Sequence, residues 1–210
     1  MIKKIFKENY MYLIILVLLI LVFYFTFNSK LGVRITEFDN TVFILKDKIV
    51  TNKLTNIFTT FTFVGDFYIP FIIIVCILMF KKKKANFGIL IFGYALSGLV
   101  TLISKNVIAR PRPLNALIDI PSSYSFPSGH TMTSFVFYIT LCFLLTYNSK
   151  KNIKYVSFIF SILFVLLIGF SRIYLGVHFL SDVLFGLLFG IVIFLMIVNI
   201  VNKNYKERLK

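Results

Sequence analysis

The sequence predicts an all-α polytopic membrane protein with six transmembrane helices in one helical bundle. Hydrophobic residues make up 59% of the 210 residues, more than a water-soluble domain could bury. Uncharged apolar runs also recur along the chain, each close to the roughly 20 residues that a helix needs to cross a bilayer. Because these runs leave no room for a separate soluble domain, residues 1–210 are expected to form a single membrane domain.

Six apolar runs qualify as transmembrane helices. They cover residues 10–27, 57–80, 85–105, 130–147, 154–171 and 177–201. The first run follows basic residues, as in a signal peptide, but it lacks a small-residue cleavage site, so we expect an uncleaved helix. Residues 28–56 mix apolar and charged residues, which is typical of a helix lying along the membrane surface. Pro70 is expected to kink the second run or to begin its fully apolar part.

The net charge of +15 follows from membrane topology rather than from a nucleic-acid partner. If the six runs alternate in direction, fourteen basic residues fall on one side of the membrane. They are Lys3, Lys4, Lys7, Lys81, Lys82, Lys83, Lys84, Lys150, Lys151, Lys154, Lys203, Lys206, Arg208 and Lys210. The positive-inside rule makes that side cytoplasmic, so both termini are expected in the cytoplasm. The same basic residues suit contact with anionic membrane phospholipids. The sequence does not indicate an oligomeric state.

Several residues inside the runs are expected to have structural roles. Cys76 and Cys142 are expected to be buried packing residues, because their spacing fits neither a disulfide nor a metal site. Gly186 and Gly190 are small residues that favour close helix packing. Asp66 is expected at the membrane interface, with contact to a functional site as the alternative.

A set of polar residues that topology does not explain falls at one end of the runs. Its members are Lys105, Arg110, Arg112, His130, Arg172, His178 and Asp182. With alternating runs, all of them lie at the outer face of the membrane. Each one alone could be a helix cap or a cation reaching the interface. Independent caps, however, give no reason for two histidines, an aspartate and several cations to share one layer, so we expect a common site.

The cations and the start of the fourth run suit the binding of a phosphate group. Lys105, Arg112 and Arg172 can neutralise a phosphate dianion, and an arginine can bind it with two hydrogen bonds. Ser128 could be an ordinary helix cap. Together with Gly129, it could instead offer a hydroxyl and free backbone N–H groups to an anion.

The remaining residues suit nucleophilic and acid–base catalysis. His178 and Asp182 are spaced i, i+4, so on a helix they share a face. A carboxylate bonded to one imidazole nitrogen makes the other nitrogen a better nucleophile. His130 is then available to protonate a leaving oxygen. No metal or other cofactor is expected, because the neighbouring cations would repel a divalent ion.

These residues also resemble the type-2 phosphatidic-acid phosphatase family, whose active site is shared with vanadium haloperoxidases. The matching motifs lie within residues 105–182 and are Lys105-x6-Arg112-Pro113, Pro127-Ser128-Gly129-His130 and Ser171-Arg172-x5-His178-x3-Asp182. The resemblance implies that His178 forms a phosphohistidine, that Asp182 orients it, and that His130 protonates the leaving group and then helps to activate water. It also implies a set of residues that hold the phosphoryl oxygens without a metal, namely Lys105, Arg112, Ser128, Gly129 and Arg172.

The resemblance implies an integral-membrane lipid-phosphate phosphatase, and the substrate stays open between several lipids. Phosphatidylglycerophosphate or phosphatidic acid is one expectation, and undecaprenyl diphosphate is the alternative. A transporter that uses the cations as an anion path is the alternative from another class. Transport sites usually lie near the bilayer midplane, whereas these residues gather at one surface.

Overall fold

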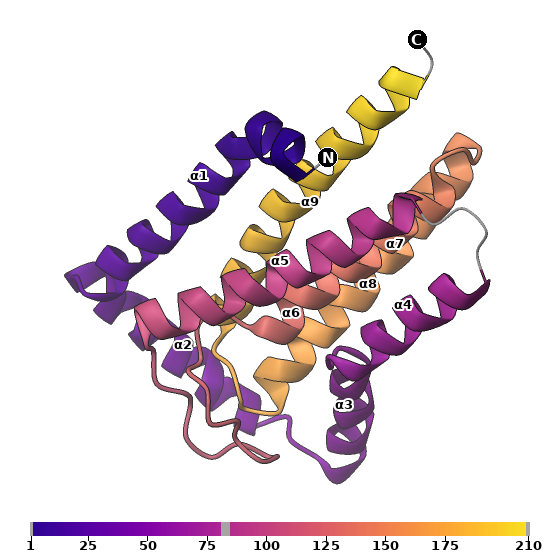
Figure 1. The fold of residues 1–210 in the computed structure, drawn as a ribbon. Helices are drawn as coiled ribbons and strands as arrows, with labels where there is room; N and C mark the ends of the chain where they lie inside the picture. Colours follow the sequence, from indigo (N-terminus) through magenta and orange to yellow (C-terminus); the bar gives the residue numbers. More distant parts are fainter. Residues whose placement is uncertain (1, 81–84, 209–210) are drawn as a thin grey trace.

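The structure, a computed structural model, describes residues 2–80 and 85–208. Within these ranges every regular element is a helix, as Figure 1 shows, so the all-α prediction is confirmed. The elements are α1 (Ile2–Phe27), α2 (Lys30–Asp47), α3 (Asn52–Val64), α4 (Tyr68–Phe80), α5 (Ala85–Ile108), α6 (Gly129–Ser134), the π-helix η1 (Phe135–Ile139), α7 (Thr140–Thr146), α8 (Lys151–Tyr174) and α9 (Leu180–Arg208).

The helices agree with the prediction of six membrane spans. Five helical segments in the described ranges are long and apolar enough to cross a membrane. They are α1, α5, the continuous α6–η1–α7 segment, α8 and α9. A sixth candidate results when α3 and α4, the latter through Cys76, are counted as one span, in which they meet at a bend of 47°. The second predicted span is therefore a broken helix.

The break between α3 and α4 precedes the proline that the sequence had singled out. Gly65 caps the end of α3, and Oδ1 of Asp66 accepts a hydrogen bond from the Phe67 N–H at 2.7 Å. Pro70 lies in the first turn of α4, where its missing N–H costs no helical hydrogen bond. Pro70 thus belongs to the start of the apolar half of the span, and the bend lies before it.

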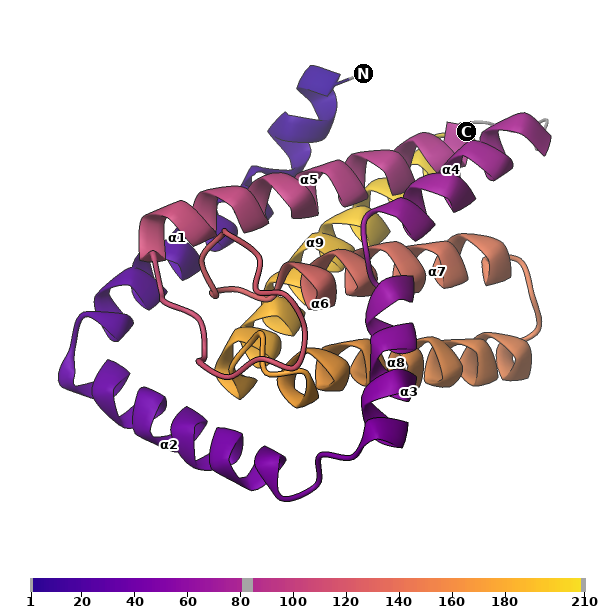
Figure 2. The same ribbon diagram turned by 90° about the horizontal axis from the view of Figure 1, so that it is seen from below.

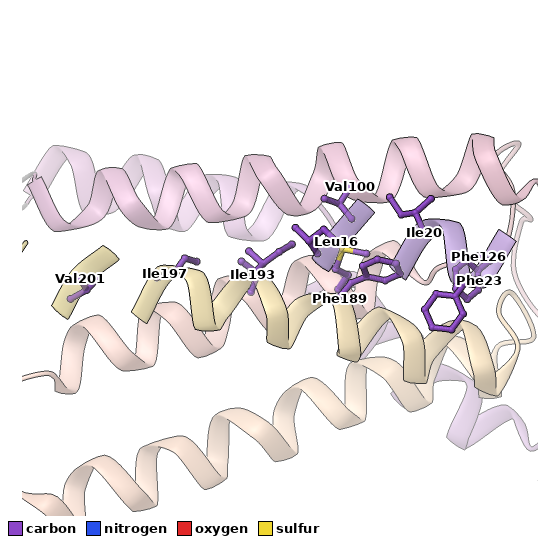
Figure 3. Packing of buried hydrophobic residues seen from close by; sticks show 11 residues of the cluster. Leu16, Ile20, Phe23, Val100, Phe126, Phe189, Ile193, Ile197 and Val201 are labelled. Carbon is purple, nitrogen blue, oxygen red and sulfur yellow. The ribbon is translucent and has the colours of Figure 1, made fainter. Parts of the chain in front are cut away.

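Helix α9 packs against α1, α5, α6 and η1 and forms the centre of the bundle. Buried hydrophobic side chains from these elements, with Phe126 from the link before α6, build the main core, which Figure 3 shows from close by. The cluster consists of Leu16, Ile20, Phe23, Val100, Phe126, Met132, Val136, Phe189, Ile193, Ile197 and Val201. Because lipid tails are as apolar as these side chains, close packing is the main force that holds such helices together.

Two glycines of α9 let the fourth span approach closely. A Cβ atom at Gly186 would lie 2.9 Å from the backbone oxygen of Ser128, and one at Gly190 would lie 2.9 Å from the ring of Phe135. Any larger residue would push these elements apart, so the predicted close packing is confirmed. The approach also allows the Ser128 N–H to donate to the backbone oxygen of Asp182 at 2.9 Å. The turn that opens α6 is thereby fixed against the start of α9.

The segments that carry the predicted site residues lie at one end of the bundle (Figures 1 and 2). Residues 109–128 join α5 to α6, and residues 175–179 join α8 to α9. Helix α2 packs against α8 and α9 at this end. It is the helix expected within residues 28–56, and its placement along the membrane surface stays a prediction. Helix α1 begins and helix α9 ends at the opposite end of the bundle (Figure 1).

One expectation about the cysteines was wrong. Cys142 is buried as predicted, but Cys76 is exposed. Helix α4 packs against α3 and α5 and leaves Ile72 and Val75 exposed on its surface as well. Of the basic residues behind the topology prediction, residues 81–84 and Lys210 lie outside the described part of the chain.

Candidate active site

His178 and Asp182 face each other at the start of α9. His178 Nδ1 lies 3.6 Å from Asp182 Oδ2 and 3.5 Å from Ser125 Oγ. The predicted pair is formed, but not on a shared helical face, because α9 begins only at Leu180. Instead, the Phe179 N–H donates to Asp182 Oδ2 at 2.9 Å. This bond resembles the backward contact of a capping box and fastens the link that carries His178 to the first turn of α9.

The Asp182 carboxylate is enclosed and held by two further donors. The Ser125 hydroxyl donates a short hydrogen bond to Oδ2. Arg110 Nη1 donates to Oδ1 at 2.7 Å. Since Asp182 has no exposed surface, these partners replace the water that an ionised carboxylate would otherwise need. Its orientation toward His178 is therefore set by residues of two links, Arg110 and Ser125 from 109–128 and Phe179 from 175–179.

The opposite nitrogen of the His178 ring faces an arginine. His178 Nε2 lies 3.3 Å from Arg112 Nη1. Arg112 is held there by bonds from Nη1 to the Val177 oxygen and from Nε to the Ser123 oxygen, both 2.7 Å long. Burial lowers the pKa of Arg112. Burial also lowers the pKa of His178 to about 4, against the opposing effect of the Asp182 carboxylate. The imidazole is therefore neutral near pH 7, which is the form that a nucleophile needs.

The other two predicted cations complete one positive cluster. Arg172 lies in the last turn of α8 and is almost fully buried. Its Nη1 donates a short bond to Thr62 Oγ1 of α3, while its buried Nε has no protein partner. Lys105, in the last turn of α5, donates to the Tyr124 backbone oxygen. Lys105 lies within electrostatic range of both Arg112 and Arg172.

The turn that opens α6 contains Ser128 and Gly129, the two residues expected to offer a hydroxyl and N–H groups to a phosphate. Ser128 occupies the N-cap position, but its hydroxyl does not cap the helix and accepts a bond of 2.9 Å from Thr131 Oγ1. The first N–H groups of a helix have no intrahelical acceptor, and Gly129 and His130 supply two of them. His130 is half-buried and lies within electrostatic range of His178. Ser128 is thus the N-cap residue by position, but its hydroxyl does not make the capping hydrogen bond.

All the predicted site residues thus lie in one region at the same end of the bundle. Residues that the sequence did not single out also contact this region, among them Asp39, Thr62 and Ser125. Asp66 bonds to the Phe67 N–H and lies within electrostatic range of Arg172, and the direct hydrogen bond to Arg172 comes from Thr62, one turn earlier. Ser125 lies only two residues before the Pro127 motif. Asp39 and Thr62 carry no local signal in the sequence.

The described residues contain no group of three or more His, Cys, Asp or Glu side chains placed to hold a metal ion. Both Asp182 oxygens are already engaged by Arg110, Ser125 and Phe179. The positive charge that this region can offer to an anionic ligand comes from the cluster of Lys105, Arg112 and Arg172.

Comparison with known families identifies the group to which this fold and site belong. The profile of the PAP2 superfamily matches residues 86–206, which include every predicted site residue. The chain belongs to the PAP2 superfamily. Phosphatidylglycerophosphatase B of Bacillus subtilis (strain 168) is 34% identical over 163 residues, covering 75% of this chain and 77% of that protein. Undecaprenyl-diphosphatase of Sulfolobus acidocaldarius is 32% identical over 132 residues, which is 60% of each protein.

Solved structures agree with this membership of the PAP2 superfamily. The transmembrane PAP2 type phosphatidylglycerolphosphate phosphatase from Bacillus subtilis matches with a TM-score of 0.79 and 26% sequence identity, covering 94% of this chain and 96% of that one. Aquifex aeolicus LpxE matches with a TM-score of 0.58 and 32% identity, covering 76% and 93%. Together with the apolar helices, the transmembrane relative identifies this PAP2 chain as a multi-pass membrane protein.

Proposed function

We propose that this PAP2 protein is a metal-independent lipid-phosphate phosphatase that hydrolyses a phosphomonoester lipid, phosphatidylglycerophosphate or phosphatidic acid. The observation that carries the proposal is the bracketing of one imidazole ring, with Asp182 beside Nδ1 and Arg112 beside Nε2 of His178. A carboxylate and a cation on opposite nitrogens suit a nucleophile that attacks an anionic group. The similarity to phosphatidylglycerophosphatase B supports the substrate class.

In the first step, Nε2 of His178 attacks the phosphorus of the lipid phosphate. The bond from phosphorus to the lipid oxygen breaks, and His130 gives a proton to that oxygen as the alcohol leaves. Asp182, whose Oδ2 lies 3.6 Å from Nδ1, stabilises the positive charge that develops on the ring. The phosphoryl group remains on His178 as a phosphohistidine.

In the second step, water attacks the phosphohistidine. His130, which has lost its proton, takes one from the water, the phosphorus–nitrogen bond breaks, and inorganic phosphate leaves. The phosphoryl oxygens carry negative charge in both steps. Groups already in place to neutralise that charge lower the barrier without reorganisation. They are Lys105, Arg112, Arg172, the Ser128 hydroxyl and the Gly129 N–H.

The proposal includes an orientation in the cell membrane. The active site lies on the extracytoplasmic side and both termini are cytoplasmic, because the predicted inner side carries fourteen basic residues. The location of the site opposite the start of α1 and the end of α9 supports this orientation (Figure 1). The chain acts as a single membrane domain, with its catalytic motifs within residues 105–182 and membrane lipids as its partners.

A second candidate function is the hydrolysis of undecaprenyl diphosphate. The 32% identity to the undecaprenyl-diphosphatase of Sulfolobus acidocaldarius favours it. The same residues could transfer the terminal phosphoryl group of a diphosphate, with the lipid monophosphate as the leaving group. The alternative from another class is a transporter of an anion or a lipid, which would catalyse no reaction.

A lipid panel with purified protein in detergent tests these alternatives. Phosphate release is measured from phosphatidylglycerophosphate, phosphatidic acid and undecaprenyl diphosphate, each with and without EDTA. We expect release from a monophosphate lipid, unchanged by EDTA and inhibited by vanadate, which can mimic five-coordinate phosphorus at His178. A preference for the diphosphate would select the second candidate. A phosphatase can release phosphate in detergent, where no membrane gradient exists, whereas a transporter cannot act there. Absence of phosphate release from every lipid would therefore favour the transporter.

The panel includes a matched pair of variants. Asp182→Asn should abolish most of the activity, because an amide orients the His178 ring differently and lacks the negative charge. Asp119→Asn makes the same chemical change at an exposed residue of the 109–128 loop and should leave activity unchanged. Activity that disappears in EDTA and returns with magnesium or zinc would overturn the metal-independent mechanism.

A further inference from the structure

Helix α2 is joined to the proposed catalytic carboxylate through a single arginine. Arg110 Nη1 donates to Asp182 Oδ1 at 2.7 Å, and its Nη2 donates to Asp39 Oδ2 at 2.7 Å. Asp39 belongs to α2 and lies 71 residues before Arg110 in the chain. Both carboxylate side chains have no exposed surface, and the arginine is 6% exposed. The three groups form a buried chain of charges, acid–base–acid.

Ser181 closes this network from the side of α9. Its N–H donates to Asp39 Oδ1 at 2.9 Å, and its hydroxyl donates a short bond to Asp39 Oδ2. Its hydroxyl oxygen also accepts a bond of 2.7 Å from Arg110 Nη1. Asp39 is therefore bonded both to the arginine that holds Asp182 and to the residue that precedes Asp182.

Two aromatic rings enclose the arginine. Its guanidinium carbon lies 4.8 Å from the ring centre of Phe27 and 4.3 Å from that of Phe179. Electrostatic interactions are strong where water is excluded, and a planar guanidinium can serve two carboxylates at once. Breaking a buried ion pair is costly because the remaining charge stays unpaired. The enclosure therefore leaves Arg110 and Asp182 little freedom to reorient.

We propose that Asp39 and Arg110 are positioning residues for the phosphatase reaction, and the inference rests on the function proposed above. They hold the Asp182 carboxylate so that Oδ2 faces Nδ1 of His178, which makes α2 part of the active-site architecture. The sequence placed Arg110 among the cations expected to share one site. In the structure, its two terminal nitrogens are bonded to the carboxylates of Asp182 and Asp39. Arg112, two residues later, is the arginine beside the reacting nitrogen.

This role predicts a specific kinetic effect. A misplaced Asp182 weakens the nucleophile without removing any phosphate ligand, so the turnover number falls while KM changes little. The turnover number falls by the same factor for an aryl phosphate and for a lipid phosphate, because the same His178 nitrogen attacks both. A role of Arg110 in binding phosphate would instead raise KM.

The test compares Asp39→Asn with Glu37→Gln in purified enzyme. Glu37 is an exposed carboxylate on the same helix, so the second variant makes a matching change outside the network. We expect Asp39→Asn to lower kcat by about tenfold or more, as is typical when a group that orients a reacting residue is lost, with KM within about twofold of the wild type. Glu37→Gln should equal the wild type.

Arg110→Lys keeps a positive charge beside Asp39 and Asp182, so neither buried carboxylate loses its counter-charge and the protein can still fold. The variant therefore tests the geometry that the guanidinium provides. A lysine cannot reach both acids in the same geometry, and kcat should fall with little change in KM. If Asp39 acts through Arg110, adding Asp39→Asn to Arg110→Lys should cost much less than the Asp39→Asn change costs alone. Additive losses, or a rise in KM instead of a fall in kcat, would overturn the proposal.

Thermal unfolding of the wild type and the same variants gives a readout that does not depend on activity. Coupled shifts in Tm for the Asp39 and Arg110 variants would support the link between the two side chains even if no lipid phosphate were hydrolysed, and that outcome would refute only the proposed function. An active wild type with an Asp39→Asn variant as fast as Glu37→Gln would refute the positioning role and leave the proposed function intact.

Discussion

Nε2 of His178 lies 3.3 Å from Nη1 of Arg112, on the ring edge opposite to the nitrogen that faces Asp182. A phosphate group that reaches this nitrogen also meets the guanidinium. In the proposed mechanism, the same contact favours binding of the anion and neutralises the charge that develops during attack. The proposal therefore gives the two nitrogens of His178 different tasks.

The two histidines should fail differently when each is replaced by alanine. His178→Ala removes the atom that bonds to phosphorus, so turnover should vanish with every substrate. His130→Ala removes the proton donor, whose help is typically worth about 10²–10⁴-fold for a poor leaving group. An aryl phosphate such as p-nitrophenyl phosphate leaves with little protonation, so it should lose much less activity than a lipid phosphate. Measuring kcat and KM for both substrates checks this, and equal losses in both variants would contradict the assignment.

Arg172→Lys should weaken substrate binding. The arginine bonds to Thr62 through Nη1, and its buried Nε has no protein partner, so the planar group can hold α3 and a phosphoryl oxygen together. A lysine offers one ammonium group and loses a charge-assisted hydrogen bond of about 1.5–3 kcal/mol, which corresponds to roughly a tenfold to hundredfold rise in KM.

The control for this variant is Arg34→Lys, which makes the same exchange at an exposed position of α2. Its KM should match the wild type. An Arg172→Lys enzyme with unchanged KM would show that Arg172 is structural rather than a phosphate ligand.

Ser125→Ala should slow turnover, because the hydroxyl donates to Asp182 Oδ2 and lies 3.5 Å from His178 Nδ1. Its removal leaves a buried carboxylate oxygen with one donor fewer, at a cost of about 1–3 kcal/mol. We expect kcat to fall and KM to hold. Ser122→Ala, at an exposed position three residues earlier, is the matched control, and a loss shared by both variants would point to loop structure instead.

The orientation in the membrane can be tested with single cysteines in intact cells. In a background without Cys76 and Cys142, Leu114→Cys lies in the loop of the active site, where Leu114 is 78% exposed. Asn152→Cys lies at the start of α8, at the opposite end of the bundle, and is also exposed. A membrane-impermeant thiol reagent should label position 114 and miss position 152. The reverse labelling pattern would contradict an extracytoplasmic site.

The sequence by itself determined the helical membrane fold and the residues of the candidate site. Length and hydrophobicity of a run are local properties, so the spans could be read directly from the chain. The motifs around Arg112, His130 and His178 have fixed spacings, and alternating spans bring them to one face. The prediction of continuous helix was wrong at two places, between α3 and α4 and just before Leu180. A short non-helical link interrupts the helix at each place, and such a link changes the apolar pattern of the run too little to be recognised.

Only the tertiary structure decided which residues support the side chains of the candidate site. Asp39 bonds to Ser181 across 142 positions of the chain, and Thr62 bonds to Arg172 across 110. An aspartate or a threonine on a mixed helix carries no periodic signal of such a contact. These pairs exist because α2 and α3 pack beside α8 and α9 at one end of the bundle. The same packing separates two arginines only two positions apart, since Arg110 pairs with buried carboxylates while Arg112 faces Nε2 of His178.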